Sequence, residues 1–236
     1  MGLAPARPRR VVVPNLRRPG DLPLLLHPPP HPHARHGRRR GLSTLGGVGD
    51  RSELTGLLAD PGAYLDHPDP TIRRLAVAGA PPELLPTVAR LAVDDPDPGV
   101  RREAVEALGT APLELARPAL AHARRDPDPG VVEATATAYG ELGDPEAVAW
   151  LAEIAAEHPD RLVREAAVAA LGAVGDPAGL PVLLRLVATG PPQVRRRCVV
   201  ALTVFDGPEV DAAIHAAAED RNPMVREVAE QLLGRR

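Results

Sequence analysis

The sequence predicts an all-α fold, an α-solenoid in which about six antiparallel helix pairs stack into a right-handed superhelix. Three observations predict it. One segment recurs at a nearly constant interval, each copy carries helix start signals at the same place, and aromatic residues make up only 2% of the chain. Without large rings the core must consist of alanine, valine and leucine, which suits closely packed helices better than a β-sandwich or a barrel.

The repeat is most evident in two stretches. DPDPGVRREAVEALG occupies residues 95–109, and DPDPGVVEATATAYG occupies residues 126–140. Related stretches begin at His67, His158, Thr189 and Asp220. One aliphatic residue anchors each copy, at intervals of 28 to 32 residues: Ile72, Val100, Val131, Val163, Val194 and Val225. A constant period of this kind indicates a repeat protein in which each copy is one supersecondary unit.

Each copy has the signals of a helix that starts just before its anchor. In five copies the side chain three residues before the anchor can accept the free N–H groups of a starting helix. These side chains are Asp69, Asp97, Asp128, Asp160 and Asn222. Proline follows most of them, at the first helical position, where no N–H is needed. Small or aliphatic residues then recur at i+4 and i+8, as in Val100, Ala104 and Leu108, which is the spacing of one buried stripe.

Each of these helices is expected to end at a glycine and to be followed by a second helix. The glycines expected at the C′ position are Gly109, Gly140, Gly172 and Gly234. A second apolar pattern follows, and it is most evident in residues 144–157 and 176–189, which both begin with Asp-Pro. Each repeat is therefore predicted to be a pair of antiparallel helices.

The residues four positions after the anchors are mostly small, which lets stacked helices approach closely. They are Ala76, Ala104, Thr135, Ala167, Cys198 and Ala229. Cys198, the only cysteine, is expected to serve packing, and a single cysteine excludes an intramolecular disulfide and a thiolate zinc site. Because no apolar run approaches the roughly 18 residues of a membrane helix, we expect a cytoplasmic protein with no membrane partner.

Charge divides the chain into two predicted parts. Residues 1–49 hold nine arginines, one acid, nine prolines and four histidines, for a net charge of +8, while residues 50–236 carry −11. Residues 1–49 lack any periodicity that could bury a face and are predicted to be disordered, and residues 50–236 form the predicted repeat domain. The histidine- and arginine-rich tract could alternatively bind metal or nucleic acid.

The pattern D-x-[DN]-P-x-V-R-x-x-A-x-x-A-L-G, which extends over residues 52–236, resembles the short bacterial HEAT-like repeat found also in phycobilisome lyase subunits. Tetratricopeptide and ankyrin signatures are absent. The resemblance implies a ladder that joins an arginine after each anchor to an acid in a neighbouring turn. The matching residues are Arg73, Arg101, Arg164, Arg195 and Arg226 for the arginine, and Asp95, Asp126 and Asp220 for the acid. The ladder is interrupted by Val132 at an arginine position and by His67, His158 and Thr189 at acid positions.

Enzymes on this scaffold require residues that the chain lacks. HEAT-like deoxyhypusine hydroxylases bind a di-iron centre through His-Glu pairs, and this sequence contains no His-Glu dipeptide. A HEAT-like alkyl-purine glycosylase needs aromatic platforms, whereas Trp150, Tyr139 and the other rings are spread over separate repeats. The glycines of residues 41–50 lack the lysine of a phosphate-binding loop. We therefore expect no catalytic residue, no cofactor and no metal.

What remains is a binding surface on the concave side, which the helix beginning at each anchor is expected to line. Nine arginines recur there: Arg73, Arg74, Arg101, Arg102, Arg164, Arg195, Arg196, Arg197 and Arg226. The run from Arg195 to Arg197 exceeds what a ladder needs and is the expected ligand-facing spot. The sequence thus predicts a non-catalytic scaffold or adaptor that binds a protein partner with an acidic segment.

Two other functions stay open. One is an enzyme-associated factor, such as a phycobilisome lyase-like or hydroxylase-like subunit. The other is nucleic-acid binding through the arginines, which the negative charge of residues 50–236 and the scarcity of stacking rings disfavour.

Deleting residues 1–45 is expected to leave the melting temperature unchanged within about 2 °C, because these residues have no pattern able to bury a face. Circular dichroism melts of the full and shortened chains measure this difference. A large loss of stability would show instead that the N-terminal segment packs on the repeats.

Overall fold

The computed structural model of the protein describes residues 51–234, which belong to one compact unit of the chain, Thr44–Arg236. The predictions made for residues 1–49 lie outside the described residues.

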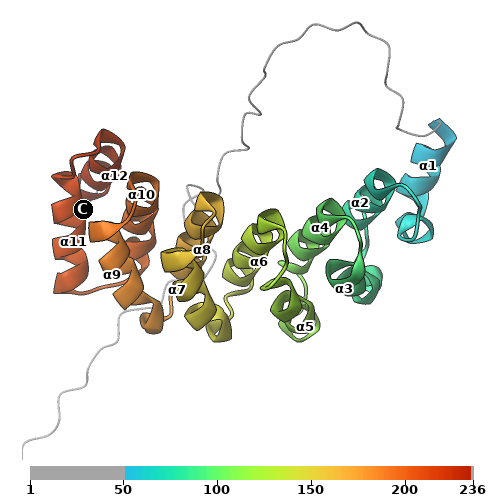
Figure 1. Ribbon diagram of the computed structural model, residues 1–236, viewed down its shortest axis with the longest axis horizontal. Helices are drawn as coiled ribbons and strands as arrows, with labels where there is room; N and C mark the ends of the chain where they lie inside the picture. Colours follow the sequence, from blue (N-terminus) through green and yellow to red (C-terminus); the bar gives the residue numbers. More distant parts are fainter. Residues whose placement is uncertain (1–50, 235–236) are drawn as a thin grey trace, which may run out of the picture. The chain divides into compact units, whose positions relative to one another are not determined.

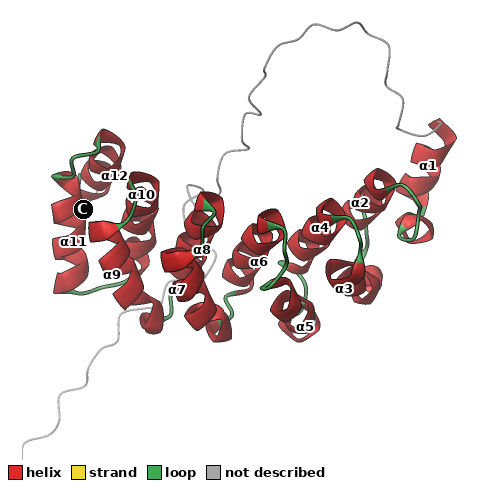
Figure 2. Ribbon diagram, in the orientation of Figure 1, coloured by secondary structure: helices red, strands yellow, loops and turns green. Residues whose placement is uncertain are grey.

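Residues 51–234 form twelve α-helices and no strand (Figure 2). The first three pairs are α1 (Arg51–Ala59) with α2 (Pro70–Ala78), α3 (Leu85–Asp94) with α4 (Pro98–Leu108), and α5 (Leu113–Ala123) with α6 (Pro129–Leu142). The next three are α7 (Val148–Glu157) with α8 (Arg161–Val174), α9 (Leu180–Thr189) with α10 (Pro192–Ala201), and α11 (Pro208–Ala218) with α12 (Pro223–Leu233). The predicted all-α fold of about six helix pairs is confirmed.

The pairs stack in chain order. Each even-numbered helix packs against the next even-numbered helix, and the contact between α6 and α8 is the most extensive between helices of the described chain. Figure 1 shows the even-numbered helices in one row and α3, α5, α7, α9 and α11 in a second row. The outward surface of the even-numbered row is called the even face below. All nine arginines of the predicted binding surface lie on even-numbered helices, although Arg73 and Arg195 are buried.

All five predicted capping side chains are confirmed, and a helix starts before each of the six anchors. The Asp97 carboxylate accepts the Val100 N–H at 3.1 Å, and the Asp160 carboxylate accepts the Leu162 N–H at 2.7 Å. Asp69, Asp128 and Asn222 cap α2, α6 and α12 in the same way. Helix α10 begins after Pro191 without a side-chain cap. Each capping oxygen satisfies an N–H group that has no partner inside its own helix.

The predicted helix ends are only partly correct. Gly140 and Gly172 lie inside α6 and α8, which continue to Gly143 and Gly175, the residues with left-handed φ of 65° and 67°. Gly109 and Gly234 do follow their helices, but with right-handed backbone. The two internal glycines serve close packing instead. A Cβ on Gly172 would lie 2.8 Å from the Cα of Ala201, and one on Gly140 would lie 2.9 Å from the Cα of Ala170.

Small side chains fill the contacts between stacked helices. Ala104, Ala167, Cys198 and Ala229 have no solvent exposure. Burial raises the pKa of the Cys198 thiol to about 12, so the thiol stays protonated near neutral pH and serves packing. The buried Thr135 hydroxyl donates to the Val131 carbonyl at 2.8 Å, which satisfies it inside its own helix.

Gly172→Ala is expected to destabilise the protein by about 1–3 kcal/mol, because the new methyl group would meet the backbone of α10. Alanine in an unobstructed helix interior is instead more favourable than glycine by about 0.5–1 kcal/mol. The sign of the change in unfolding free energy, measured by urea denaturation, decides between these outcomes. A stabilised variant would contradict the close approach of α8 and α10.

Candidate functional site

Three arginines of the even-numbered helices form rungs between successive repeats. Arg101 Nε donates to Asp126 Oδ2 at 2.7 Å and Nη2 donates to Asp126 Oδ1 at 2.8 Å. Arg101 Nη1 also donates to the carbonyl of Asp95 in its own turn at 2.9 Å. The Asp126 carboxylate in turn accepts the Asp128 N–H at 2.9 Å. One guanidinium therefore joins two turns and the start of the next helix.

The same rung recurs in two other places, Arg73 with Asp95 and Arg195 with Asp220. Arg195 is only 3% exposed, so its charge depends on this partner. The hydrogen bond from Arg195 holds the pKa of the Asp220 carboxyl below its ordinary value. Burial alone would raise the pKa of Asp126, but hydrogen bonds from Arg101 and the Asp128 N–H lower it overall. The ladder that the resemblance implied is thus confirmed at these three rungs.

Two adjacent rungs are absent, as the sequence predicts. Between the third and fourth repeats Val132 replaces the arginine and His158 replaces the acid. Between the fourth and fifth repeats Arg164 is present, but Thr189 stands at the acid position and its hydroxyl donates to the Arg185 carbonyl at 2.8 Å. The Nε of Arg164 is buried and has no hydrogen-bond partner among the described residues.

A charged group at the junction of α8 and α10 is called the α8–α10 cluster below and consists of Arg161, Glu165, Arg196 and Arg197. Arg161 Nη1 lies 3.3 Å from Glu165 Oε1. Arg197 lies within the electrostatic range of Glu165 and Arg196, and burial lowers the pKa of its guanidinium. Its Nε is buried and finds no acceptor in the described chain. The cluster holds three cations and one acid, so it carries excess positive charge.

The structure does not bring the nine predicted arginines into one uniform row. Arg73, Arg101 and Arg195 are used in rungs, and Arg226 donates to the Asp220 carbonyl of its own turn at 2.7 Å. Four others lie one or two residues after a rung arginine. Of these, Arg74 and Arg102 are exposed, and Arg196 and Arg197 are half-buried. Arg164 occupies the incomplete rung. At the equivalent positions of other repeats acids take their place: Glu103, Glu133, Glu165 and Glu227.

Sequence reasoning missed a second set of contacts, between α5, α6 and α7. Arg117 of α5 pairs with the fully buried Asp144, with both of its N–O distances 3.1 Å. The Arg124 guanidinium lies 4.5 Å from the centre of the Tyr139 ring and 5.4 Å from that of Trp150. These contacts join α5, α6 and α7 at the repeat boundary where the first rung is absent. The short distance in sequence between Tyr139 and Trp150 was the available signal.

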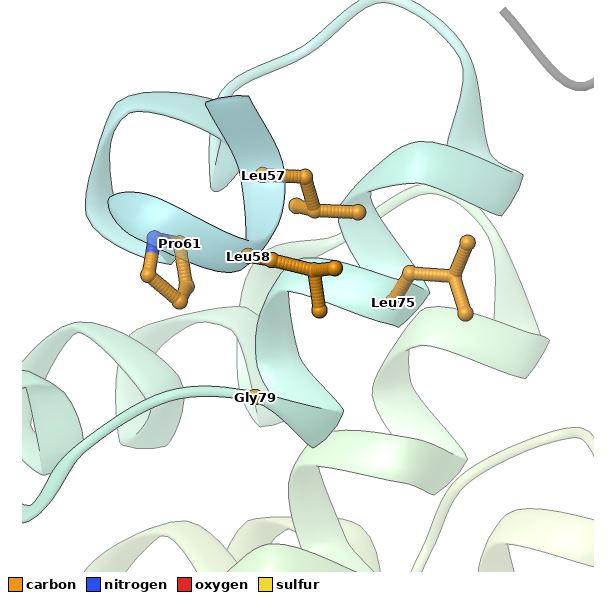
Figure 3. A pocket seen from close by; sticks show the side chains of 5 residues that line it. All are labelled: Leu57, Leu58, Pro61, Leu75 and Gly79. Atoms are coloured by element: carbon orange, nitrogen blue, oxygen red, sulfur yellow. The ribbon is translucent and has the colours of Figure 1, made fainter. Parts of the chain in front are cut away.

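The first helix pair has an apolar pocket of about 340 Å³, lined by Leu57, Leu58, Pro61, Leu75 and Gly79 (Figure 3). Leu58 is 85% exposed, which marks this pair as the end of the described stack. Within residues 51–234 no group of three or more histidine, cysteine or acidic residues could hold a metal ion. None of the described helices is long and apolar enough to cross a membrane.

Comparison with known proteins places this architecture among repeat proteins. A family model of HEAT repeats matches residues 61–139 and 118–203, together more than half of the chain. Among solved structures, Escherichia coli YibA is similar with a TM-score of 0.54 and 17% identity, over 82% of this chain and 75% of that one. A designed armadillo repeat protein in complex with the peptide (KR)4 is similar with a TM-score of 0.54 and 16% identity, over 75% and 98%. Another designed armadillo repeat protein gives 0.51 and 15%, over 74% and 97%.

At these identities the likeness concerns the fold, and it confirms the predicted α-solenoid. No curated protein matches the sequence.

Asp220→Asn is expected to lower the unfolding free energy at neutral pH by about 3 kcal/mol, because it leaves the buried Arg195 without its counter-charge. The folded-state pKa of Asp220 lies below its ordinary 3.8, so this stabilisation is present above that pH and is lost as pH falls through the folded-state pKa. Urea denaturation of both proteins at a series of pH values should show the difference between them shrinking under acid conditions. The exposed Asp206→Asn is the matched control and should show no such difference at neutral pH.

Proposed function

Since the chain belongs to the HEAT repeat family, we propose that it is a non-catalytic scaffold that binds another protein through the even face. A repeat solenoid of this kind is suited to protein binding, because its stacked helices present one long surface. The proposed partner carries an acidic segment. Its proposed contacts are Arg74, Arg102, Arg164, Arg196, Arg197 and Arg226, while Arg73, Arg101 and Arg195 hold the ladder behind them.

One observation carries this proposal: the arginines of the repeat divide into satisfied and unsatisfied groups. Each rung arginine donates to a carboxylate of the next repeat. Arg164 and Arg197 each have a buried Nε with no acceptor in the described chain. A buried donor without an acceptor costs free energy, and a carboxylate on a partner would supply the missing acceptor.

The cationic excess of the α8–α10 cluster favours the same ligand. Arg197 lies near the Arg196 guanidinium and near Glu165, and Glu165 is already paired with Arg161. A partner carboxylate would reduce the mutual repulsion of these guanidinium groups. The designed armadillo repeat protein of similar fold is in complex with the basic peptide (KR)4, which supports peptide binding by this fold but not the charge of the ligand.

The test is the binding of a fluorescein-labelled oligoglutamate peptide, followed by fluorescence anisotropy, with an oligoglutamine peptide of equal length as the neutral control. Arg196→Glu with Arg197→Glu is expected to weaken oligoglutamate binding by about tenfold or more. Arg195 is left unchanged, because reversing its charge would break the rung with Asp220. Raising the salt concentration should weaken the wild-type complex, as expected for an electrostatic contact near the surface.

The matched control is Arg125→Glu with Arg185→Glu, which reverses two exposed arginines outside the even-numbered helices. It should bind the peptide nearly as well as the wild type. Equal loss in both double variants, or no loss in the first, would contradict the proposed surface. Equal binding of oligoglutamate and oligoglutamine would contradict an acidic ligand.

A further inference from the structure

The boundary between the third and fourth repeats contains a hollow of about 470 Å³ at the edge where the turns meet. Its lining includes Asp126, Val132, His158 and Asp160, and it is called the notch below. The notch lies at the rung that has neither an arginine nor an acid. Its shape and chemistry can therefore be compared with those of the complete rungs.

In two of the three complete rungs the arginine donates to two backbone carbonyls of its own turn, and in the third Arg195 donates to one, that of Gly190. Arg73 Nη1 donates to the carbonyls of His67 and Pro68 at 2.8 and 3.2 Å. Arg101 Nη1 donates to the carbonyls of Asp95 and Pro96 at 2.9 and 3.3 Å.

The equivalent carbonyls of the third repeat belong to Asp126 and Pro127, and both residues line the notch. Val132 occupies the position of the donating arginine, and its side chain has no donor to offer. The third repeat thus keeps the two acceptors and lacks the guanidinium.

The opposite wall of the notch contains His158 and one carboxylate, that of Asp160. His158 Nδ1 accepts the Asp160 N–H at 3.1 Å, just as Asp126 Oδ1 accepts the Asp128 N–H. His158 therefore forms the same turn as the acid of a complete rung, but it does not supply a carboxylate. Asp160 also lines the notch, and its carboxylate caps α8 but forms no ion pair within the described residues.

We propose that the notch binds an arginine side chain of a partner protein. The incoming guanidinium would donate to the carbonyls of Asp126 and Pro127, stack on the His158 ring and be neutralised by Asp160. Arginine fits better than lysine because, in the complete rungs, a planar guanidinium with several fixed donors binds the equivalent carbonyls.

The notch is not needed to hold the repeats together. The pair of half-buried Arg117 with buried Asp144 crosses the same boundary on the odd-numbered side, and α6 contacts α8 extensively. The boundary can therefore leave a rung vacant without separating. This site is independent of the acidic-segment site of the proposed function, because it has the opposite charge preference and lies at a different repeat boundary.

The probe for the test is N-acetyl-arginine amide, titrated into the full-length protein and followed by NMR chemical shifts of the backbone amides. N-acetyl-citrulline amide, which has a similar shape and no charge, is the matched control. The arginine compound is expected to shift the amides around Val132, His158 and Asp160 and to saturate in the millimolar range, with citrulline binding about tenfold more weakly.

Two variants test the residues. Asp160→Asn keeps a capping oxygen for α8 and removes the charge, so it should weaken binding of the arginine probe by about tenfold while α8 stays folded. Val132→Arg with His158→Asp rebuilds the complete rung inside the chain. It should raise the melting temperature and abolish the arginine-induced shifts at the notch.

The proposal is overturned if arginine and citrulline derivatives bind alike, if the arginine-induced shifts lie elsewhere, or if the rebuilt rung leaves binding unchanged. The oligoglutamate test of the α8–α10 cluster uses a different probe and different variants. Failure of the arginine site at the notch is therefore distinguishable from failure of the proposed acidic-segment site.

Discussion

No helix pair of this protein can bury its apolar side alone, and the close approach of neighbouring even-numbered helices is the constraint on which the rest depends. That approach reaches backbone contact where Gly140 and Gly172 pass the alanines of the next helix. It requires small residues along the contact, such as the fully buried Ala104 and Ala167. Large side chains would push the helices apart, which explains why aromatic residues are scarce in the sequence.

The arginine rungs follow from the same geometry. Once two turns lie side by side, a long side chain after one anchor reaches the acid of the next repeat, and its remaining donor satisfies a carbonyl of its own turn. The guanidinium groups of complete rungs are therefore mostly internal. Each of these charges is neutralised by the carboxylate of its own rung. It therefore contributes to stacking and adds little positive charge to the surface.

The candidate binding features occur where repeats depart from the common pattern. The boundary of the third and fourth repeats lacks the arginine, and the next boundary lacks the acid. At the first boundary the missing arginine leaves the carbonyls of Asp126 and Pro127 and the Asp160 carboxylate without a guanidinium partner in the described part of the chain. At the second boundary the missing acid leaves Arg164 with a buried Nε that has no acceptor among the described residues. Bracing by Arg117, Arg124, Tyr139 and Trp150 allows the first departure without loss of the stack. The ligands proposed for these two neighbouring boundaries therefore have opposite charges.

The helix starts, the six pairs, the buried anchors and the positions of the rungs could all be predicted from the sequence. Caps and apolar stripes depend on residues three or four positions apart, so the information is local. The rung positions were implied by the resemblance to HEAT-like repeats, and the repeat showed which copies keep the arginine and the acid.

Other features depend on residues far apart in the chain, and only the tertiary structure decided them. Gly140 and Gly172 looked like helix ends, but their role depends on alanines about thirty residues later. The bracing of Asp144 by Arg117 joins residues 27 positions apart. Which arginines remain available for a ligand is decided in the same way. A guanidinium is free or satisfied according to the residue that stacking places opposite it, and the arginine's own position in the sequence does not contain that information.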